Sequence, residues 1–141
     1  MDLPPRIGRF TLVEEVGKSP TSIVAKAHDE SLDSPAIVKL ISLGDERFAT
    51  RCMRGLERWQ QLGIGGIQKL VDIGKAHGQA WYAADPVMGG TLQAELEERK
   101  STGQRWTDKQ VFQIGRKIAA TLDLLHGLQI VHGNLKPSNV L

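Results

Sequence analysis

The sequence predicts an α+β fold in which strands come first and helices dominate the second half. Short stretches of alternating or β-branched apolar residues, bounded by turn residues, are typical of strands. Five such stretches occur, at 10–16, 21–28, 34–41, 67–74 and 79–84. Apolar residues at every third or fourth position predict amphipathic helices at 44–62 and from Thr107 onward. Thr91 is the expected N-cap of a shorter helix that runs to about Lys100.

Length and composition exclude several classes of protein. The 141 residues are 40% hydrophobic and 24% charged, which predicts one soluble globular unit or part of one. The net charge of +2 is too small to indicate nucleic acid or a membrane surface as a partner. No apolar run approaches the ~20 residues of a membrane span, and the first residues lack a signal-peptide core. Because Cys52 is the single cysteine, an internal disulfide is excluded, and we expect a cytoplasmic location.

The first two predicted strands form a hairpin. Adjacent prolines near the start of the chain lack backbone donors, so residues 1–8 are expected to be an extended lead-in. Residues 17–22 contain Gly, Pro and Ser, and are expected to turn the chain between the two strands. The next strand carries one lysine, Lys39, inside an apolar run, with Val38 and Leu40 expected on the opposite face.

The last ten residues, HGNLKPSNVL, carry the most specific motif. They resemble the catalytic loop of eukaryotic-type Ser/Thr protein kinases, whose pattern is H-R-D-L-K-P-x-N-I-L. The matching positions are His132, Leu135, Lys136, Pro137 and Asn139. Asn134 stands where the family has its catalytic Asp, and Gly133 stands where it has Arg. The resemblance, which runs from about Gly8 to Leu141, implies a kinase-like amino-terminal lobe with a five-stranded antiparallel sheet and one helix, followed by the start of the helical lobe.

The same resemblance implies a nucleotide site for ATP. The first hairpin corresponds to the phosphate-covering loop, G-x-G-x-x-G-x-V, in which glycines let backbone N–H groups approach phosphate oxygens. Gly17 and Val24 match this pattern, whereas Ser19 and Ser22 stand at the second and third glycines. Serine offers N–H and hydroxyl donors, but it tolerates positive φ poorly.

The resemblance assigns further nucleotide contacts to five residues. Lys39 corresponds to the lysine that pairs with the α- and β-phosphates, and Ile37 to the alanine that lies against adenine. The segment 85–90 resembles the kinase hinge, where the Asp85 carbonyl and the Val87 N–H would face the adenine edge. Leu141 matches the apolar residue that closes the adenine pocket from below.

The predicted helix at 44–62 does not carry its expected glutamate. In the family this helix supplies a Glu that pairs with the strand lysine, and the matching position here is Gly55. Glu57 is the nearest carboxylate, but two residues along a helix correspond to about 200° of rotation. Either the register is shifted and Glu57 pairs with Lys39, or the ion pair is absent. We favour absence, because a mid-helix Gly also costs about 1 kcal/mol relative to Ala.

The catalytic loop keeps some of the family's groups and lacks others. The resemblance assigns Lys136 to the transferred phosphate and Asn139 to Mg²⁺. Asn134 has the shape of the catalytic Asp, but its amide cannot take up the proton of a substrate hydroxyl. ATP and Mg²⁺ are therefore the implied cofactors, with weak or absent binding left open.

Domain limits and function follow from this resemblance. We expect a lead-in at 1–8, a kinase-like lobe at 9–84, a hinge at 85–90 and a partial second lobe at 91–141 that is truncated after the catalytic loop. The expected function is that of a pseudokinase, which acts by binding or regulation of a protein partner through its kinase-like surface or the missing lobe. The alternative is a fragment of an active or engineered-inactive Ser/Thr kinase, a transferase that moves the ATP γ-phosphate to protein hydroxyls.

The helix predicted from Thr107 onward carries an apolar stripe that bears on the solubility of the chain. Its apolar stripe consists of Val111, Ile114, Ile118, Leu122 and Leu125. A stripe of this length is expected to need a partner surface that the 141 residues do not contain. We therefore expect the chain alone to be poorly soluble or oligomeric.

Overall fold

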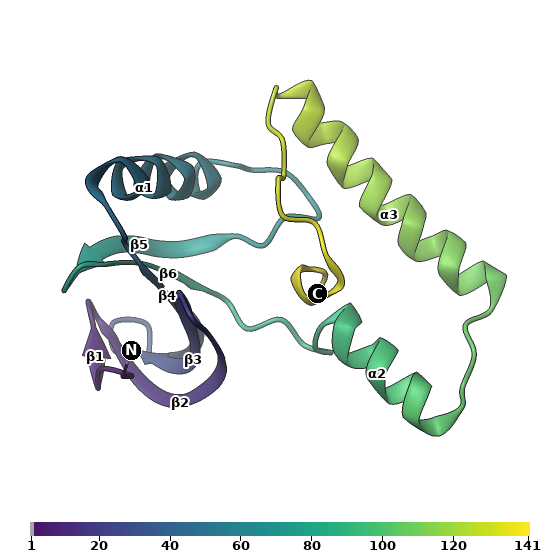
Figure 1. Cartoon of the computed structure of the whole chain (residues 1–141), viewed down its shortest axis with the longest axis horizontal. Helices are drawn as coiled ribbons and strands as arrows, with labels where there is room; N and C mark the ends of the chain where they lie inside the picture. The colour runs from purple at the N-terminus through teal and green to yellow at the C-terminus, as the bar shows by residue number, and fades with distance from the viewer. Residues whose placement is uncertain (1) are drawn as a thin grey trace. The chain divides into compact units, whose positions relative to one another are not determined.

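The computed structural model describes residues 2–141, which divide into two compact units. Unit 1 comprises the chain up to Gly63 together with Gln68–Pro86, and unit 2 comprises Ile64–Ile67 together with Val87–Leu141. Figure 1 shows the strands and the first helix of unit 1 and the two later helices of unit 2.

Unit 1 is built on one antiparallel sheet. Its strands pair in the order β1-β2-β3-β4-β6-β5, so every neighbour except β4 and β6 is also a neighbour in the sequence (Figure 1). The strands are β1 Arg6–Ile7, β2 Phe10–Ser19, β3 Ser22–Asp29, β4 Ser34–Ser42, β5 Leu70–Ala76 and β6 Gln79–Ala84. The α+β prediction and its five strands are confirmed.

The sixth strand corrects the prediction for the start of the chain. Residues 1–8 were expected to be only an extended lead-in, but Arg6 and Ile7 pair with β2 as a two-residue edge strand. The prolines before them lack donors, yet the Pro5 carbonyl still accepts from Leu12 N at 2.9 Å. Ile7 is only 3% exposed, so its burial holds this segment against the sheet.

One face of the sheet carries the main core. Alternation along the strands sends every second side chain to this face, as expected for a sheet with two distinct sides. Phe10 and Trp81 meet edge to face with ring centroids 5.9 Å apart. The buried cluster consists of Ile7, Phe10, Leu12, Ile23, Ala27, Ala36, Val38, Leu40, Trp81 and Ala83.

The helix α1, Glu46–Gln60, packs against β5 and β6 and contributes to a second cluster. Asp45 caps its start, since the carboxylate accepts from Phe48 N at 2.7 Å. Leu56 is buried there together with Leu70, Ala80 and Ala84. The other end of α1 is fixed by the Trp59 indole, which donates to the Gln68 carbonyl at 2.8 Å. The helix predicted at 44–62 is therefore present with slightly narrower limits.

Unit 2 contains two helices and a short 3₁₀ turn. The helix α2, Leu92–Thr102, is capped by Thr91, and α3, Asp108–Gly127, begins with a reciprocal capping box between Thr107 and Gln110. The 3₁₀ turn η1, Pro137–Asn139, is followed by Val140, whose carbonyl accepts from Leu92 N at 2.8 Å. This bond joins the end of the chain to the first turn of α2.

The apolar stripe of α3 is exposed at the start of the helix and buried near its end. Val111 is 57% exposed, and Leu125 is 2% exposed. The three residues between them are half-buried: Ile114, Ile118 and Leu122. Phe112, at 70% exposure, extends the exposed apolar surface at the start of the helix. The expected oligomerisation stays a prediction.

Gly66 determines how Ile64–Ile67 lies against α3 within unit 2. Its φ is +84°, and a Cβ at this position would overlap the Thr121 hydroxyl. Glycine is needed for two independent reasons, because L residues are also disfavoured at positive φ. Gly65 beside it has open space where a Cβ would lie and no such backbone restriction.

Asp29 is the one buried charged residue in the described part of the chain, at 1% exposure. Arg9 Nε lies 2.9 Å from its Oδ2, and its Oδ1 accepts from Ser31 N at 2.9 Å and from Leu32 N at 3.2 Å. Burial alone would raise the pKa of Asp29, but the Ser31 N–H, the Arg9 guanidinium and the Leu32 N–H outweigh it and hold the pKa below its ordinary value. The carboxylate thus ties the end of β3 to the residue before β2.

We predict that Gly66→Ala destabilises the chain by about 2–5 kcal/mol, the sum of left-handed strain and the displaced Thr121 side chain. Gly65→Ala is the matched control, and it should change the free energy of unfolding by less than about 0.5 kcal/mol. Urea unfolding followed by circular dichroism measures both. Equal effects of the two substitutions would contradict this assignment.

We predict that Asp29→Asn lowers the Tm at pH 7 by about 5 °C or more, since the neutral amide cannot replace the charge-assisted bonds. Because the folded-state pKa is depressed, the stabilisation is fully present above the unfolded pKa and is lost as pH falls through the folded pKa. The difference in Tm should therefore shrink as pH is lowered from 7 towards 2. Asp123→Asn on the exposed surface of α3 is the control, and a constant difference across this range would overturn the linkage.

Candidate functional site

The predicted phosphate-covering hairpin is tighter than the sequence indicated. Residues 17–22 were expected to form the turn, but β2 continues through Ser19, which pairs directly with Ser22. Only Pro20 and Thr21 connect the strands. The two serine hydroxyls lie 2.8 Å apart, and Ser19 Oγ also accepts from Thr21 N at 3.3 Å. The hydrogen bond between the two hydroxyl groups therefore closes the hairpin. It allows the pairing of β2 with β3 to continue as far as Ser19 and Ser22.

Serine fits these two positions without backbone strain. None of Gly17, Ser19 and Ser22 adopts a positive φ. A Cβ on Gly17 would meet only Val24 Cβ at 3.8 Å, which is an ordinary contact. The register shifts between Leu12 and Glu14 and between Glu15 and Gly17 instead bend β2, as β-bulges do.

The strand register brings predicted nucleotide residues into one row. Gly17 pairs with Val24, Val24 pairs with Lys39, and Lys39 pairs with Tyr82. Neighbouring strands lie about 4.8 Å apart, so Gly17 and Lys39 are separated by two strand spacings, or about 10 Å. Ile37 lies two residues before Lys39 on β4 and therefore points to the same face. Residues from three strands, Gly17, Val24, Ile37 and Lys39, thus share one face of the sheet.

Tyr82 completes this row, and sequence reasoning missed it. Its ring lies 5.0 Å from that of Trp59, and burial raises its pKa. Ile73 of β5 pairs with it on the other side. The only available signal was that Tyr82 is the single tyrosine of the chain, within a predicted strand.

Gly55 and Glu57 lie on the exposed surface of α1. Ala49 and Leu56 are the residues of α1 that are buried, and Gly55 has open space around it. Glu57 lines a shallow depression of about 350 Å³ on the side of the helix, together with Lys75 of β5 and Met53. The depression contains none of the predicted nucleotide residues.

The predicted hinge residues are exposed. The carbonyl of Asp85, expected to face adenine, accepts from the Gln68 side chain at 3.1 Å. A carbonyl oxygen has two lone pairs, so this bond occupies half of its accepting capacity. Gln68 is a second residue that sequence reasoning missed. Val87 is 43% exposed, and it is followed within two residues by Gly89, with φ of +106°.

The catalytic-loop segment is held by its own hydrogen bonds. Asn134 N donates to His132 Nδ1 at 3.2 Å, and the Asn134 carbonyl accepts from Asn139 Nδ2 at 2.8 Å. Gly133 between them has φ of +72°, a conformation that glycine adopts without strain. The side-chain amide NH2 group of Asn139 is used in its bond to the Asn134 carbonyl. Its side-chain oxygen is therefore the atom suited to a metal ion.

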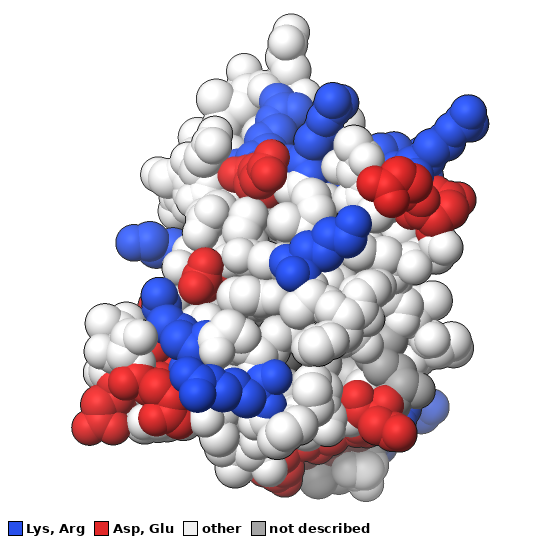
Figure 2. All heavy atoms as spheres, turned by 90° about the vertical axis from the view of Figure 1, so that its left-hand side faces the viewer, with Lys and Arg blue, Asp and Glu red and all other residues white. Residues whose placement is uncertain are grey.

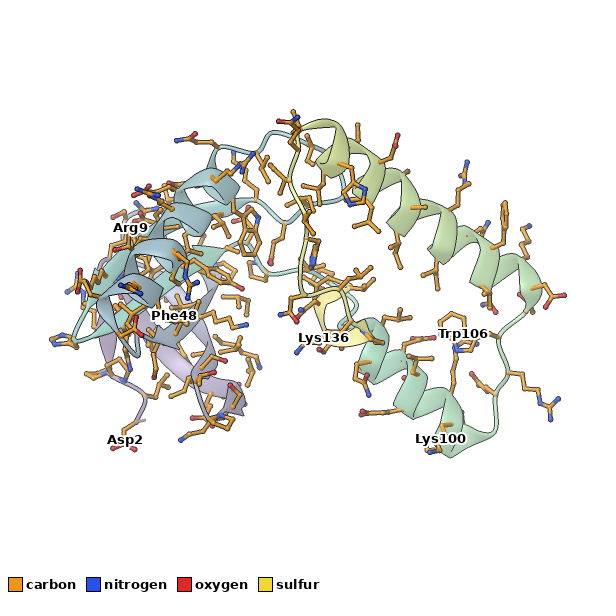
Figure 3. The ribbon with its side chains drawn as sticks, turned by 45° about the horizontal axis from the view of Figure 1, so that its top comes forward. Asp2, Arg9, Phe48, Lys100, Trp106 and Lys136 are labelled. Carbon is orange, nitrogen blue, oxygen red and sulfur yellow. The ribbon has the colours of Figure 1, made fainter. Side chains whose placement is uncertain are left out.

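The other two loop residues lie close to η1. Lys136 directly precedes it, and its carbonyl accepts from Asn139 N at 2.9 Å (Figure 3). The Lys136 side chain is exposed, as is Leu141 at 56%. The loop thus presents one cation and two amide side chains, Asn134 and Asn139.

Two features that are absent from residues 2–141 bear on the kind of site. No group of three or more His, Cys, Asp and Glu side chains there is arranged to hold a metal ion. A Mg²⁺ ion bound at Asn139 would therefore need other oxygen ligands, such as phosphate oxygens. No helix in this part of the chain has the length and apolar character to cross a membrane.

Comparisons with known proteins identify relatives along the whole chain, although no family model matches. Human serine/threonine-protein kinase H2 is 24% identical over 138 residues, which cover 98% of this chain and 35% of the kinase. Serine/threonine-protein kinase PknL of Mycobacterium tuberculosis is 26% identical over 136 residues, 94% of this chain and 33% of the kinase. The chain therefore spans about a third of these relatives.

Solved structures agree with these relatives on the fold. The PknI kinase domain of Mycobacterium tuberculosis superposes with a TM-score of 0.81 at 24% identity, over 98% of this chain and 57% of that domain. A double mutant of the same domain gives a TM-score of 0.85 over 99% and 56%. The chain is thus a homologue of Ser/Thr protein kinases, with the fold of a kinase amino-terminal lobe and the start of the helical lobe.

Proposed function

We propose that this kinase-like chain acts mainly by binding, as a pseudokinase, and that any nucleotide it holds supports its conformation. The observation that carries the proposal is Asn134 at the position of the catalytic Asp. The loop around it is well formed, since its backbone is bonded to both His132 and Asn139. These bonds support the proposal of an ordered loop in which the side chain at the proton-accepting position is a neutral amide.

The resemblance assigns nucleotide contacts to residues of each unit, and the two sets are proposed separately. In unit 1, the cross-strand row of Gly17, Val24 and Lys39 would take the phosphates, with Ile37 beside the adenine and the Asp85 carbonyl at its edge. Ser19 and Ser22 would face the phosphates with backbone N–H groups, because their hydroxyls are bonded to each other. We propose that these units correspond to the lobe expected at 9–84 and the partial lobe at 91–141, with the hinge at 85–90.

In unit 2, the proposed contacts are Val87, Lys136, Asn139 and Leu141. The Val87 N–H would meet the adenine edge, and Leu141 would lie below the ring. Lys136 would lie against the terminal phosphate, and the Asn139 amide oxygen would reach Mg²⁺. Phosphoryl transfer depends chiefly on positioning and on electrostatic stabilisation, so the loss of the Asp charge weakens both the orientation and the deprotonation of a substrate hydroxyl.

A second function has a specific observation in its favour. Lys39, Lys136 and Asn139 are all retained, and they are the groups that an active Ser/Thr kinase would need for phosphates and metal. The alternative is accordingly a kinase whose catalytic Asp has been replaced, by nature or by engineering. The two functions predict different results for Asn134→Asp, which restores the carboxylate: only the alternative predicts that phosphoryl transfer returns.

We predict that Lys39→Met weakens binding of a fluorescent ATP analogue with Mg²⁺ by about tenfold or more, because one charge-assisted contact contributes about 1.5–3 kcal/mol. Lys75→Met, which removes an exposed lysine from strand β5 of the same sheet, should change the Kd by less than about twofold. A fluorescence titration measures both. Equal affinity in the two variants would remove Lys39 from the site.

We predict that neither the natural protein nor its Asn134→Asp variant incorporates labelled γ-phosphate above a Lys39→Met blank. Gly55 stands where the family has its helix Glu, so the Asn134→Asp variant restores only one of the two carboxylates that the resemblance assigns to an active kinase. The assay uses Mg-ATP and a basic protein as acceptor. If Asn134→Asp instead gains activity on the scale of ~10²–10⁴-fold, typical of a general base, the alternative is correct.

A further inference from the structure

The exposed side of α1 carries a row of four arginines. Arg47, Arg51, Arg54 and Arg58 are spaced at i, i+4, i+7 and i+11, and all four are exposed. At 3.6 residues per turn, they lie within about 60° of one another around the helix and extend for about 16 Å along it. We call this row the arginine stripe. Figure 2 shows Lys and Arg side chains in the upper part of one face with Asp and Glu side chains beside them, and further Lys and Arg side chains lower on the same face.

The stripe lies directly opposite the packed side of the helix. Leu56 and Ala49, the two buried residues of α1, are about 180° from its centre. The arginine stems therefore do not contribute to the core. In the described part of the chain, Arg47, Arg51 and Arg54 form no ion pair, although Glu46 and Glu57 are on the same helix.

The arrangement costs helix stability. Arg47 and Arg51 are like charges at i, i+4, and so are Arg54 and Arg58, and each such pair opposes helix formation. The helix α2 of the same chain shows the opposite pattern. There Glu95 and Arg99 form an i, i+4 ion pair with a distance of 2.6 Å. The repulsion along the row of α1 and the ion pair within α2 together indicate that the counter-charge for Arg47, Arg51 and Arg54 comes from outside the chain.

The flanks of the stripe restrict what can bind to it. On one side Glu46 and Glu57 repel a wide polyanion, so a nucleic-acid duplex or a membrane surface fits poorly. On the other side Phe48 is 39% exposed and offers an apolar contact. A single row of guanidinium groups about 16 Å long matches about five residues of extended peptide, and guanidinium is suited to bidentate carboxylate recognition.

We propose that the arginine stripe of α1 is a docking surface for a narrow acidic segment of a partner protein, with carboxylates along the arginines and one apolar side chain against Phe48. The residues involved are outside the proposed nucleotide site. This inference therefore does not depend on whether the chain binds ATP or transfers phosphate.

The test is the charge reversal Arg51→Glu, measured by binding of a labelled peptide with five Glu residues and one Leu. The 141-residue chain should bind this peptide with a Kd that rises with added salt, and Arg51→Glu should weaken binding at least tenfold. The substitution also replaces like-charge contacts to Arg47 and Arg54 with opposite-charge contacts. The variant should therefore melt at the same or a higher temperature, which separates lost binding from lost folding.

Arg116→Glu is the matched control. It makes the same change in net charge on the exposed surface of α3, where the positions three and four residues away are uncharged. It should leave the peptide Kd within twofold. Equal losses in the two variants, no binding by the natural chain, or tighter binding of a mixed-sequence oligonucleotide or of phosphatidylserine vesicles than of the peptide would each overturn the proposal.

Discussion

The antiparallel register between β3, β4 and β6 decides which side chains share a face of the sheet. In the observed register Val24, Lys39 and Tyr82 face one side, while Val38 and Trp81 face the main core. A slip of one residue would turn Lys39 into that core and expose Val38, and burying an unpaired ammonium costs several kcal/mol. The buried cluster therefore fixes the position of the lysine, and the proposed phosphate contacts depend on it.

The loop around Asn134 shows that geometry and chemistry can be separated. The bonds that hold the loop use the backbone of Asn134, and so they do not require a carboxylate at this position. Asp and Asn have nearly the same shape, and exchanging them leaves these contacts possible. A protein can consequently keep the shape of the loop without a proton acceptor at this position. This is the physical basis for proposing that the chain binds partners and does not catalyse phosphoryl transfer.

The helix α1 packs against the sheet on one side and presents arginines to solvent on the other. Its packed side is apolar and is fixed by Trp59 at one end and by the Asp45 cap at the other. Its outer side carries arginines whose mutual repulsion the packing has to offset. Residues that lower the stability of an element without an evident gain inside the fold are typical of functional surfaces.

The sequence by itself determined the fold class, the five main strands, the α1 and α3 helices and the position of Asn134. Periodicity and an ordered motif are local properties, so they can be read along the chain. It did not determine the β1 strand, the Ser19–Ser22 closure or the bond from Gln68 to Asp85, because each joins groups whose proximity depends on how the chain folds. Only the tertiary structure showed that Gly17, Val24 and Lys39 form one row and that the arginines of α1 lie opposite its core, since strand register and helix orientation are set by packing between distant residues.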